Sequence, residues 1–279
     1  MKKLFLIAVI CLAVSCKKEN TKPDPVEEIV PEKPQPKTLV KKIKFHNVSD
    51  KKQLLVTTTI ELFYKENTSI VEKATRTRTS FSSDGKITSS FEEIMTFKHN
   101  EDDLIRSSVF APNPPNSTSD PIFSEYIYKG KQLDYSTNSV GFTQYYKYDA
   151  KGNIVTIIAN KNEYYYTYND RTLTEGKYYT DRGTHFFEFS KYKNPLASLD
   201  PIVAGFAGLI FYGMVTDMPP VYLQANYLAS KTYSPTPTGG SYKVVFSVME
   251  SKNDYPLKAE ATGFTSNQTA VFEYEYLNL

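Results

Sequence analysis

The sequence predicts a mainly β protein: an antiparallel meander whose sheet is extended, curled or partly closed, with one short helical insertion near residues 200–214. Three observations support this fold class. Apolar and polar residues alternate through much of the chain after residue 38, most regularly over residues 272–276, as in a strand with one buried face. The composition, with 22 Tyr, 17 Phe and no Trp, favours strands. Glycine-containing turns separate the strand-like runs.

The turn signals lie at residues 84–86, 129–131, 151–153, 181–183 and 239–240. Each contains a glycine, which reaches the positive φ angles of hairpin turns without a steric penalty. Strands that follow one another through short turns, without helices between them, indicate an antiparallel sheet rather than a parallel α/β sheet.

One apolar segment breaks the β pattern. Asp200 is a suitable N-cap, and Pro201 suits the first position of a helix because its missing N–H has no intrahelical partner there. Apolar residues follow at helical spacing, among them Phe206 and Leu209. We expect a helix that packs on the sheet as part of the core. The alternative is an exposed apolar contact within residues 202–212, centred on Phe206 and Leu209, that touches lipid or an outer-membrane partner.

The first residues have the pattern of a secretory signal peptide. Lys2 and Lys3 precede an apolar run from Leu4 to Val14, and Ser15 precedes Cys16. A transmembrane helix needs about 20 apolar residues, so this run is too short to span a bilayer. The expected organisation is a signal peptide at 1–15, a tether rich in Pro, Lys and Glu at 16–38, and a tyrosine-rich β domain at 39–279.

Residues 12–16 resemble a bacterial lipobox, which implies that Cys16 carries a diacylglycerol. Cys11 lies in the predicted signal peptide, so Cys16 is the one cysteine expected after cleavage. Two or more acyl chains hold a protein firmly at a membrane, so no other membrane segment is required. Lys17 replaces the aspartate that would retain a lipoprotein in the inner membrane. Residues 17–20 partly resemble a surface-export signal, so we expect an outer-membrane protein exposed at the cell surface.

These pieces together resemble a family of uncharacterised Bacteroidota outer-membrane lipoproteins with Tyr-Asp-like β repeats. The matching segments are the lipobox, residues 146–154, residues 193–195, and residues 254–256 leading into residues 272–276. Fainter copies of the repeat lie at residues 126–131 and 164–170. The resemblance implies an extended or curled antiparallel sheet and no established activity.

The sequence offers no set of catalytic or metal-ligating residues. His46, His99 and His185 are far apart, the expected mature chain has no free thiol, and there is no Gly-x-Ser-x-Gly motif or phosphate-binding glycine loop. We therefore expect a non-enzymatic protein without cofactor or metal, and a hydrolase is only a third hypothesis. Removing residues 1–15 deletes two lysines and no acid, which leaves 31 basic and 31 acidic residues. This neutral balance argues against nucleic-acid binding.

Aromatic side chains in consecutive predicted strands carry the binding signal. Tyrosine combines a large apolar ring with a hydroxyl group, which suits recognition surfaces. The candidates are Tyr145, Tyr146, Tyr148, Tyr164, Tyr166 and Tyr178. They predict a domain that binds a glycan, peptide or protein at the cell surface. The alternatives are a structural component of the envelope or of an outer-membrane complex, and aromatic pairs that simply stiffen the sheet.

Overall fold

The computed structural model describes residues 38–113, 120–160, 162–178, 183–208, 219–235, 240–264 and 268–278. The predicted signal peptide and all but the last residue of the predicted tether, with Cys16, lie outside these ranges, as does Leu209. Among the described residues, no helix is long and apolar enough to cross a bilayer.

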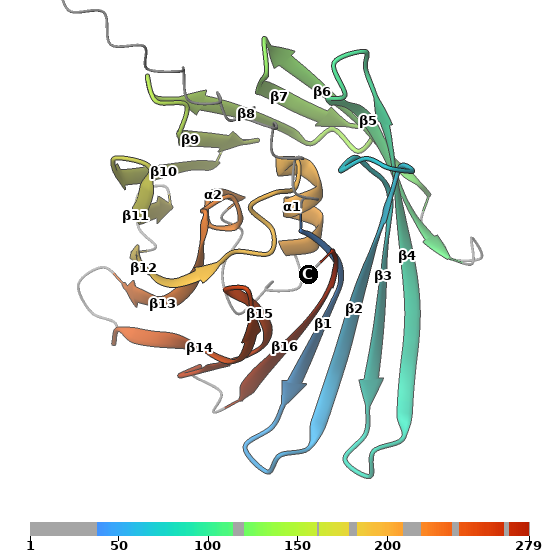
Figure 1. The fold of residues 1–279 in the computed structure, drawn as a ribbon, viewed down its shortest axis with the longest axis vertical. Helices are drawn as coiled ribbons and strands as arrows, with labels where there is room; N and C mark the ends of the chain where they lie inside the picture. Colours follow the sequence, from blue (N-terminus) through green and yellow to red (C-terminus); the bar gives the residue numbers. More distant parts are fainter. Residues whose placement is uncertain are drawn as a thin grey trace, which may run out of the picture. The chain divides into compact units, whose positions relative to one another are not determined.

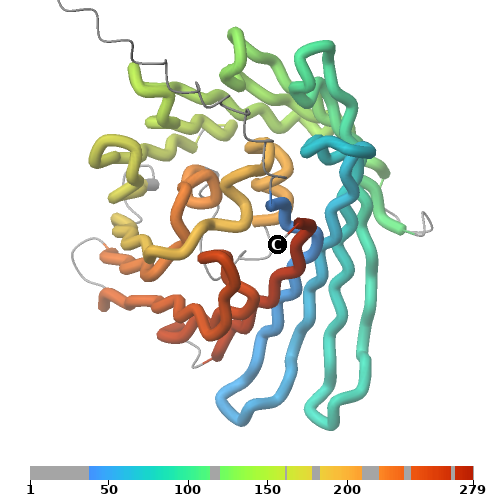
Figure 2. Tube along the Cα trace, viewed as in Figure 1, coloured from blue at the N-terminus to red at the C-terminus, as the bar shows by residue number. Residues whose placement is uncertain are grey.

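The described strands form a closed antiparallel barrel of sixteen strands, in which each strand pairs with the next and the last pairs with the first. The strands are β1 (Leu39–Val48), β2 (Leu54–Tyr64), β3 (Val71–Phe81), β4 (Ile87–His99), β5 (Ile105–Asn113), β6 (Ile122–Lys129), β7 (Gln132–Asn138), β8 (Thr143–Tyr148), β9 (Ile154–Ala159), β10 (Asn162–Asn169), β11 (Thr172–Tyr178), β12 (Thr184–Lys193), β13 (Asn226–Ser234), β14 (Tyr242–Lys252), β15 (Tyr255–Thr262) and β16 (Thr269–Leu277). The antiparallel meander is confirmed, and its closure is complete rather than partial. Figure 2 shows β1, in blue, beside β16, in red.

The alternation along the strands separates an apolar inside from a polar outside. Ile43, Ile60 and Phe272 point inward and are fully buried. Their neighbours on the same strands point outward, where Lys42 forms an ion pair with Glu61 at 2.5 Å. This arrangement buries apolar surface in one central core and places ion pairs such as Lys42–Glu61 on the outer face, although Lys231 and the Arg76–Glu93 pair lie inside.

Two short helices lie inside the ring of strands, α1 (Pro201–Gly208) and α2 (Pro219–Tyr222) (Figure 1). The predicted start of the insertion is confirmed, because the Ile202 N–H donates to Asp200 Oδ1 at 2.8 Å and the helix begins at Pro201. The described helix ends at Gly208, so the rest of the predicted 200–214 insertion falls outside the described residues. The helix α2 was not predicted.

Asn194 joins the two ends of the luminal segment, which is the stretch between β12 and β13 that carries α1 and α2. Its Oδ1 accepts a hydrogen bond from the Leu196 N–H at 3.0 Å, and its Nδ2 donates to the carbonyls of Tyr222 and Gln224 at 2.9 and 2.8 Å. The Gln224 side chain in turn accepts from the Leu173 N–H at 2.9 Å and so ties the segment to β11. These buried hydrogen bonds fix the luminal segment against the wall, since leaving such groups unpaired costs about 1–3 kcal/mol each.

Three hairpins of the wall share one construction, in the segments that suggested a repeat. Inward pairs face each other across the turns: Tyr128 and Leu133, Tyr148 and Ile154, and Tyr168 and Leu173. The Tyr148 hydroxyl donates to the Leu133 carbonyl, and the Tyr168 hydroxyl donates to the Ile154 carbonyl, both at 2.9 Å. The hydroxyls of Tyr148 and Tyr168 thus bond to the preceding hairpin, whereas the buried hydroxyl of Tyr128 makes no hydrogen bond to a described residue.

Candidate functional site

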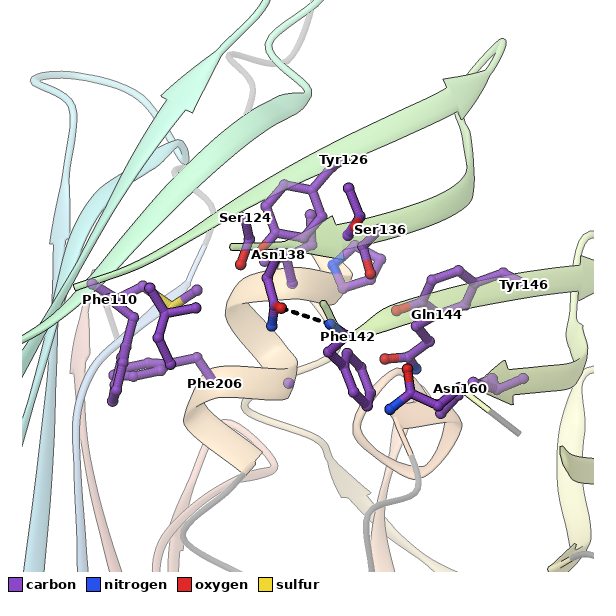
Figure 3. A pocket seen from close by; sticks show the side chains of 18 of the residues that line it. Phe110, Ser124, Tyr126, Ser136, Asn138, Phe142, Gln144, Tyr146, Asn160 and Phe206 are labelled. Atoms are coloured by element: carbon purple, nitrogen blue, oxygen red, sulfur yellow. Dashed lines mark hydrogen bonds between the residues drawn. The ribbon is translucent and has the colours of Figure 1, made fainter. Parts of the chain in front are cut away.

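A cavity of about 540 Å³ lies inside the barrel, between α1 and the inner faces of β3 to β10 (Figure 3). Its apolar lining includes Met95, Phe110, Ile157, Ile202 and Phe206. Its polar lining includes Ser124, Ser136, Asn138, Gln144, Asn160 and Asn162. This size and this mixture of apolar walls with a few polar groups are typical of small-molecule sites.

The cavity lies against the side of α1 that carries Gly205. A Cβ atom added to Gly205 would meet no atom within 4 Å, whereas one added to Gly208 would collide with the Tyr222 ring. Gly205 lines the cavity and Gly208 packs tightly against α2. The two glycines therefore distinguish an open side of the helix from a packed one.

Two asparagines of the hairpin loops lie at the cavity with fixed orientations. Asn138 Oδ1 accepts hydrogen bonds from the N–H groups of Val140 and Phe142 at 3.2 and 2.9 Å (Figure 3). Asn160 Oδ1 accepts from the Thr143 N–H at 3.1 Å. Neither Nδ2 group has a hydrogen-bond partner among the described residues. Both amides thus keep their donors available for a ligand with oxygen acceptors.

Arg76 is the one charged side chain among the described residues that line the cavity. Its Nε donates to Glu93 Oε2 at 2.5 Å. The guanidinium carbon lies 5.7 Å from the ring centroid of Phe110 and 5.3 Å from that of Phe206, distances at which a cation and a ring attract each other. The carboxylate and the two rings together hold this cation in a defined position.

The tyrosines of the wall stay neutral over the physiological pH range. Burial raises the pKa of Tyr146, against the opposing effect of its hydrogen bond with Ser136. Burial likewise raises the pKa of Tyr126, whose hydroxyl lies 2.8 Å from Ser108 Oγ. Since these hydroxyls remain protonated, the wall offers apolar rings and neutral hydrogen-bonding groups.

The six predicted aromatics do not form one surface. Tyr146 and Tyr164 line the cavity. Tyr148 and Tyr166 also point inward, as part of the packed wall. Tyr145 points outward, is 48% exposed and lies beside Tyr135, with ring centroids 5.6 Å apart. Tyr178 pairs with Tyr164 through its backbone, and its side chain is outside the described part.

The structure places Phe206 in the core, as expected for a helix that packs on the sheet, and not at the external contact that was the alternative. Phe206 is only 4% exposed and packs inside the barrel, with its ring 6.3 Å from that of Phe110. An apolar helix inside a closed barrel has the wall as its partner, so this ring does not face lipid or another protein. It lines the cavity instead.

Sequence reasoning missed the residues that give the cavity its polar character. Arg76 belongs to an alternating run of threonine and arginine that reads as an exposed strand, and Asn138 and Asn160 read as ordinary turn residues. Glu92 and Glu93 point to opposite faces of β4, as neighbours on a strand do: Glu93 bonds Arg76, and Glu92 accepts from Asn113 Nδ2 at 2.7 Å. No group of His, Cys, Asp and Glu among the described residues is arranged to hold a metal ion.

The fold and cavity define a closed antiparallel barrel with a luminal pocket. The sequence matches no protein-family model and no curated protein. The structure is similar to a porin-like protein from Bacteroides uniformis, with a TM-score of 0.55 and 12% identity over 85% of this chain and 96% of that one. A porin-like protein from Bacteroides vulgatus aligns over 87% of this chain and 100% of its own, with 13% identity and a TM-score of 0.38, too low to carry an argument. At such identities the first likeness shows the fold.

Proposed function

We propose that this chain is a lipid-anchored binding protein of the bacterial outer membrane, exposed at the cell surface, whose barrel stands in water and holds a small molecule in its lumen. The observation that carries the proposal is the luminal cavity, with its apolar walls, oriented amide donors and single cation. The similarity to a porin-like barrel agrees with an envelope protein, and the pattern around Cys16 supports the anchor.

The outer surface of the barrel supports an aqueous location. Ion pairs lie on the outward faces of the strands, such as Lys44 with Glu275 at 3.8 Å and Lys243 with Glu188 at 3.0 Å. A barrel that spans a bilayer shows the reverse pattern, with an apolar band outside and polar residues inside. Each lysine at the centre of a bilayer would cost about 2–4 kcal/mol. The lipid on Cys16 would then be the attachment to the membrane.

Replacing Cys16 by serine tests the lipid anchor and the aqueous location of the barrel together. We expect the parent chain to remain in the membrane fraction after washing with high salt and carbonate, and to incorporate radiolabelled palmitate. The Cys16→Ser chain, exported behind a signal peptide that is cleaved without lipidation, is expected to take up no label and to leave the membrane without detergent, because the charged barrel has no affinity for lipid tails. A Cys16→Ser chain that stays in the membrane until detergent is added would show that the barrel itself inserts.

Filling the cavity from α1 tests ligand binding. Gly205→Phe places a ring in the open space next to Gly205, whereas the matched control Gly205→Ala adds one methyl group. With N-phenyl-1-naphthylamine, a neutral fluorescent probe of apolar sites, we expect Gly205→Phe to lower the affinity by about tenfold or more and Gly205→Ala to retain it. Both variants should melt no lower than the parent, since each gains about 0.3–1 kcal/mol of helix propensity over glycine.

Equal binding of the probe by all three chains would contradict the luminal site. The same variants also locate any partner found on glycan or peptide arrays. A glycan or peptide that binds the parent and Gly205→Phe chains equally would place recognition on the outer surface, where Tyr135 and Tyr145 lie side by side.

A further inference from the structure

We infer that the ligand of the luminal cavity is an amphiphile with an apolar body and one carboxylate, and that Arg76 binds the carboxylate. This inference rests on the proposed luminal site and specifies the chemical class of its ligand. It concerns long-chain carboxylic acids and related molecules that combine an acid head with a hydrocarbon body.

The Arg76 guanidinium is held in place and still has free hydrogen-bond donors. Glu93 takes up the Nε donor, and the terminal nitrogens of Arg76 make no hydrogen bond to any described residue. Phe110 and Phe206 flank the group and limit its movement. A guanidinium in this state presents two parallel donors, which match the two oxygens of a carboxylate. Less side-chain entropy is lost on binding when the donor is already held in place.

The only charge among the described lining residues of the cavity is positive. Arg76 is charged and no described acidic residue lines the cavity, since its partner Glu93 is not among the lining residues. The Arg76–Glu93 pair is neutral as a whole, so the expected attraction is short-ranged and comes from the paired hydrogen bonds. An acidic ligand meets no repulsive carboxylate among these lining residues, whereas a cationic ligand meets Arg76.

The rest of the cavity lining is largely apolar. Apolar side chains from the wall and from α1, including Ile157 and Ile202, form much of the lining. Burial of a hydrocarbon chain against them contributes about 0.8 kcal/mol per methylene group. Asn138 and Asn160 line the cavity and use their Oδ1 atoms as acceptors within the protein, so their Nδ2 donors suit oxygen atoms of the ligand. A sugar would bring many hydroxyl groups to these apolar walls, so an amphiphile fits the lining better.

The test compares an acid with its neutral ester. The probes are cis-parinaric acid, a fluorescent long-chain carboxylic acid, and its methyl ester. The protein is the full mature chain, residues 16–279, carrying Cys16→Ser so that no detergent competes. We expect the parent sequence to bind the acid about tenfold more tightly than the ester, as a charge-assisted pair of hydrogen bonds predicts.

The variant for this test removes Arg76, the expected partner of the ligand's carboxylate, without leaving Glu93 as an unpaired buried charge. Arg76→Gln alone would strand Glu93, so the decisive variant is Arg76→Gln with Glu93→Gln, which keeps both side chains polar and neutral. We expect it to bind acid and ester equally. Arg78→Gln, two residues along β3 and outside the cavity lining, is the matched control and should keep the tenfold preference.

The outcomes separate this inference from the proposed function. Equal binding of acid and ester by the parent, with loss of both in Gly205→Phe, would overturn the carboxylate assignment and leave the luminal site in place. Failure of both probes to bind, or indifference of both to Gly205→Phe, would overturn the proposed function together with the inference. A preference for the acid that survives the double substitution would assign the head to another group and so contradict the role of Arg76.

Discussion

The parent protein is expected to lose about 3 kcal/mol of stability between pH 6.5 and pH 4, and His185→Gln is expected to remove most of this loss. His185 lies on β12, points into the barrel, and is 3% exposed. Its ring lies 4.7 Å from that of Tyr233 on the neighbouring strand. Burial, followed by the positive charge of Lys231, lowers the pKa of His185 to about 3.

The sign of the effect follows from proton linkage. The unfolded chain binds a proton at His185 near pH 6.5, while the folded chain resists protonation until about pH 3. As the pH falls through this interval, protonation favours the unfolded chain, and the free energy of unfolding falls by about 1.4 kcal/mol per pH unit. Above pH 6.5 both states are neutral at this site, so the contribution is constant there.

Urea unfolding at several pH values measures this slope. The control is His46→Gln, because His46 lies on the outer face of β1, where its Nδ1 is 3.0 Å from the Thr57 hydroxyl. We expect the His46→Gln chain to keep the slope of the parent and the His185→Gln chain to have a flatter one. A His185→Gln chain that loses as much stability on acidification as the parent would assign the acid sensitivity to other groups.

The sequence predicts which side chains share a face, but not which face becomes the inside. Tyr145 and Tyr146 necessarily point to opposite sides of β8, and both are large aromatic residues that could fill a core. The choice is made by partners elsewhere: Tyr146 faces Ile157 of β9, whereas Tyr145 pairs with Tyr135 on the outside. Local alternation alone therefore leaves the binding face undetermined.

Local sequence patterns could not predict that the barrel closes. The contact that closes the barrel joins β1 to β16, at opposite ends of the described chain. Turn residues and alternation specify each hairpin, but the number of strands and their stagger decide whether the edges meet. The helical insertion was predictable because its cap and its spacing are local, whereas its place inside the lumen depends on closure.

The cavity residues illustrate the same limit. Arg76 is surrounded in the sequence by threonines and another arginine, which is the usual composition of a solvent-facing strand. It points inward because its register partners, Ile60 on β2 and Glu93 on β4, do so. A charged residue on an inward face requires a partner, and Glu93 provides it from β4, the strand that follows β3 through the turn at residues 84–86.

Phe272→Ala is expected to destabilise the barrel by about 3–5 kcal/mol. Phe272 is the central ring of an aromatic cluster at the place where β16 pairs with β1. It is fully buried, and its ring lies 5.3 Å from that of Phe45 on β1 and 6.2 Å from that of Phe246 on β14. On the neighbouring strand β15, its register partner is the fully buried Ala259. Truncating the ring leaves a void that the β backbone cannot easily collapse, and it weakens the pairing of β1 with β16.

The matched control is Phe186→Ala on β12, whose ring points outward and is 41% exposed. We expect it to change the free energy of unfolding by less than about 1 kcal/mol, since little apolar area is returned to water. Urea unfolding measures both values, and amide hydrogen exchange should show faster opening of β1 and β16 in Phe272→Ala alone. Comparable losses in the two variants would contradict the assignment of inside and outside faces, because only that assignment makes one phenylalanine central and the other peripheral.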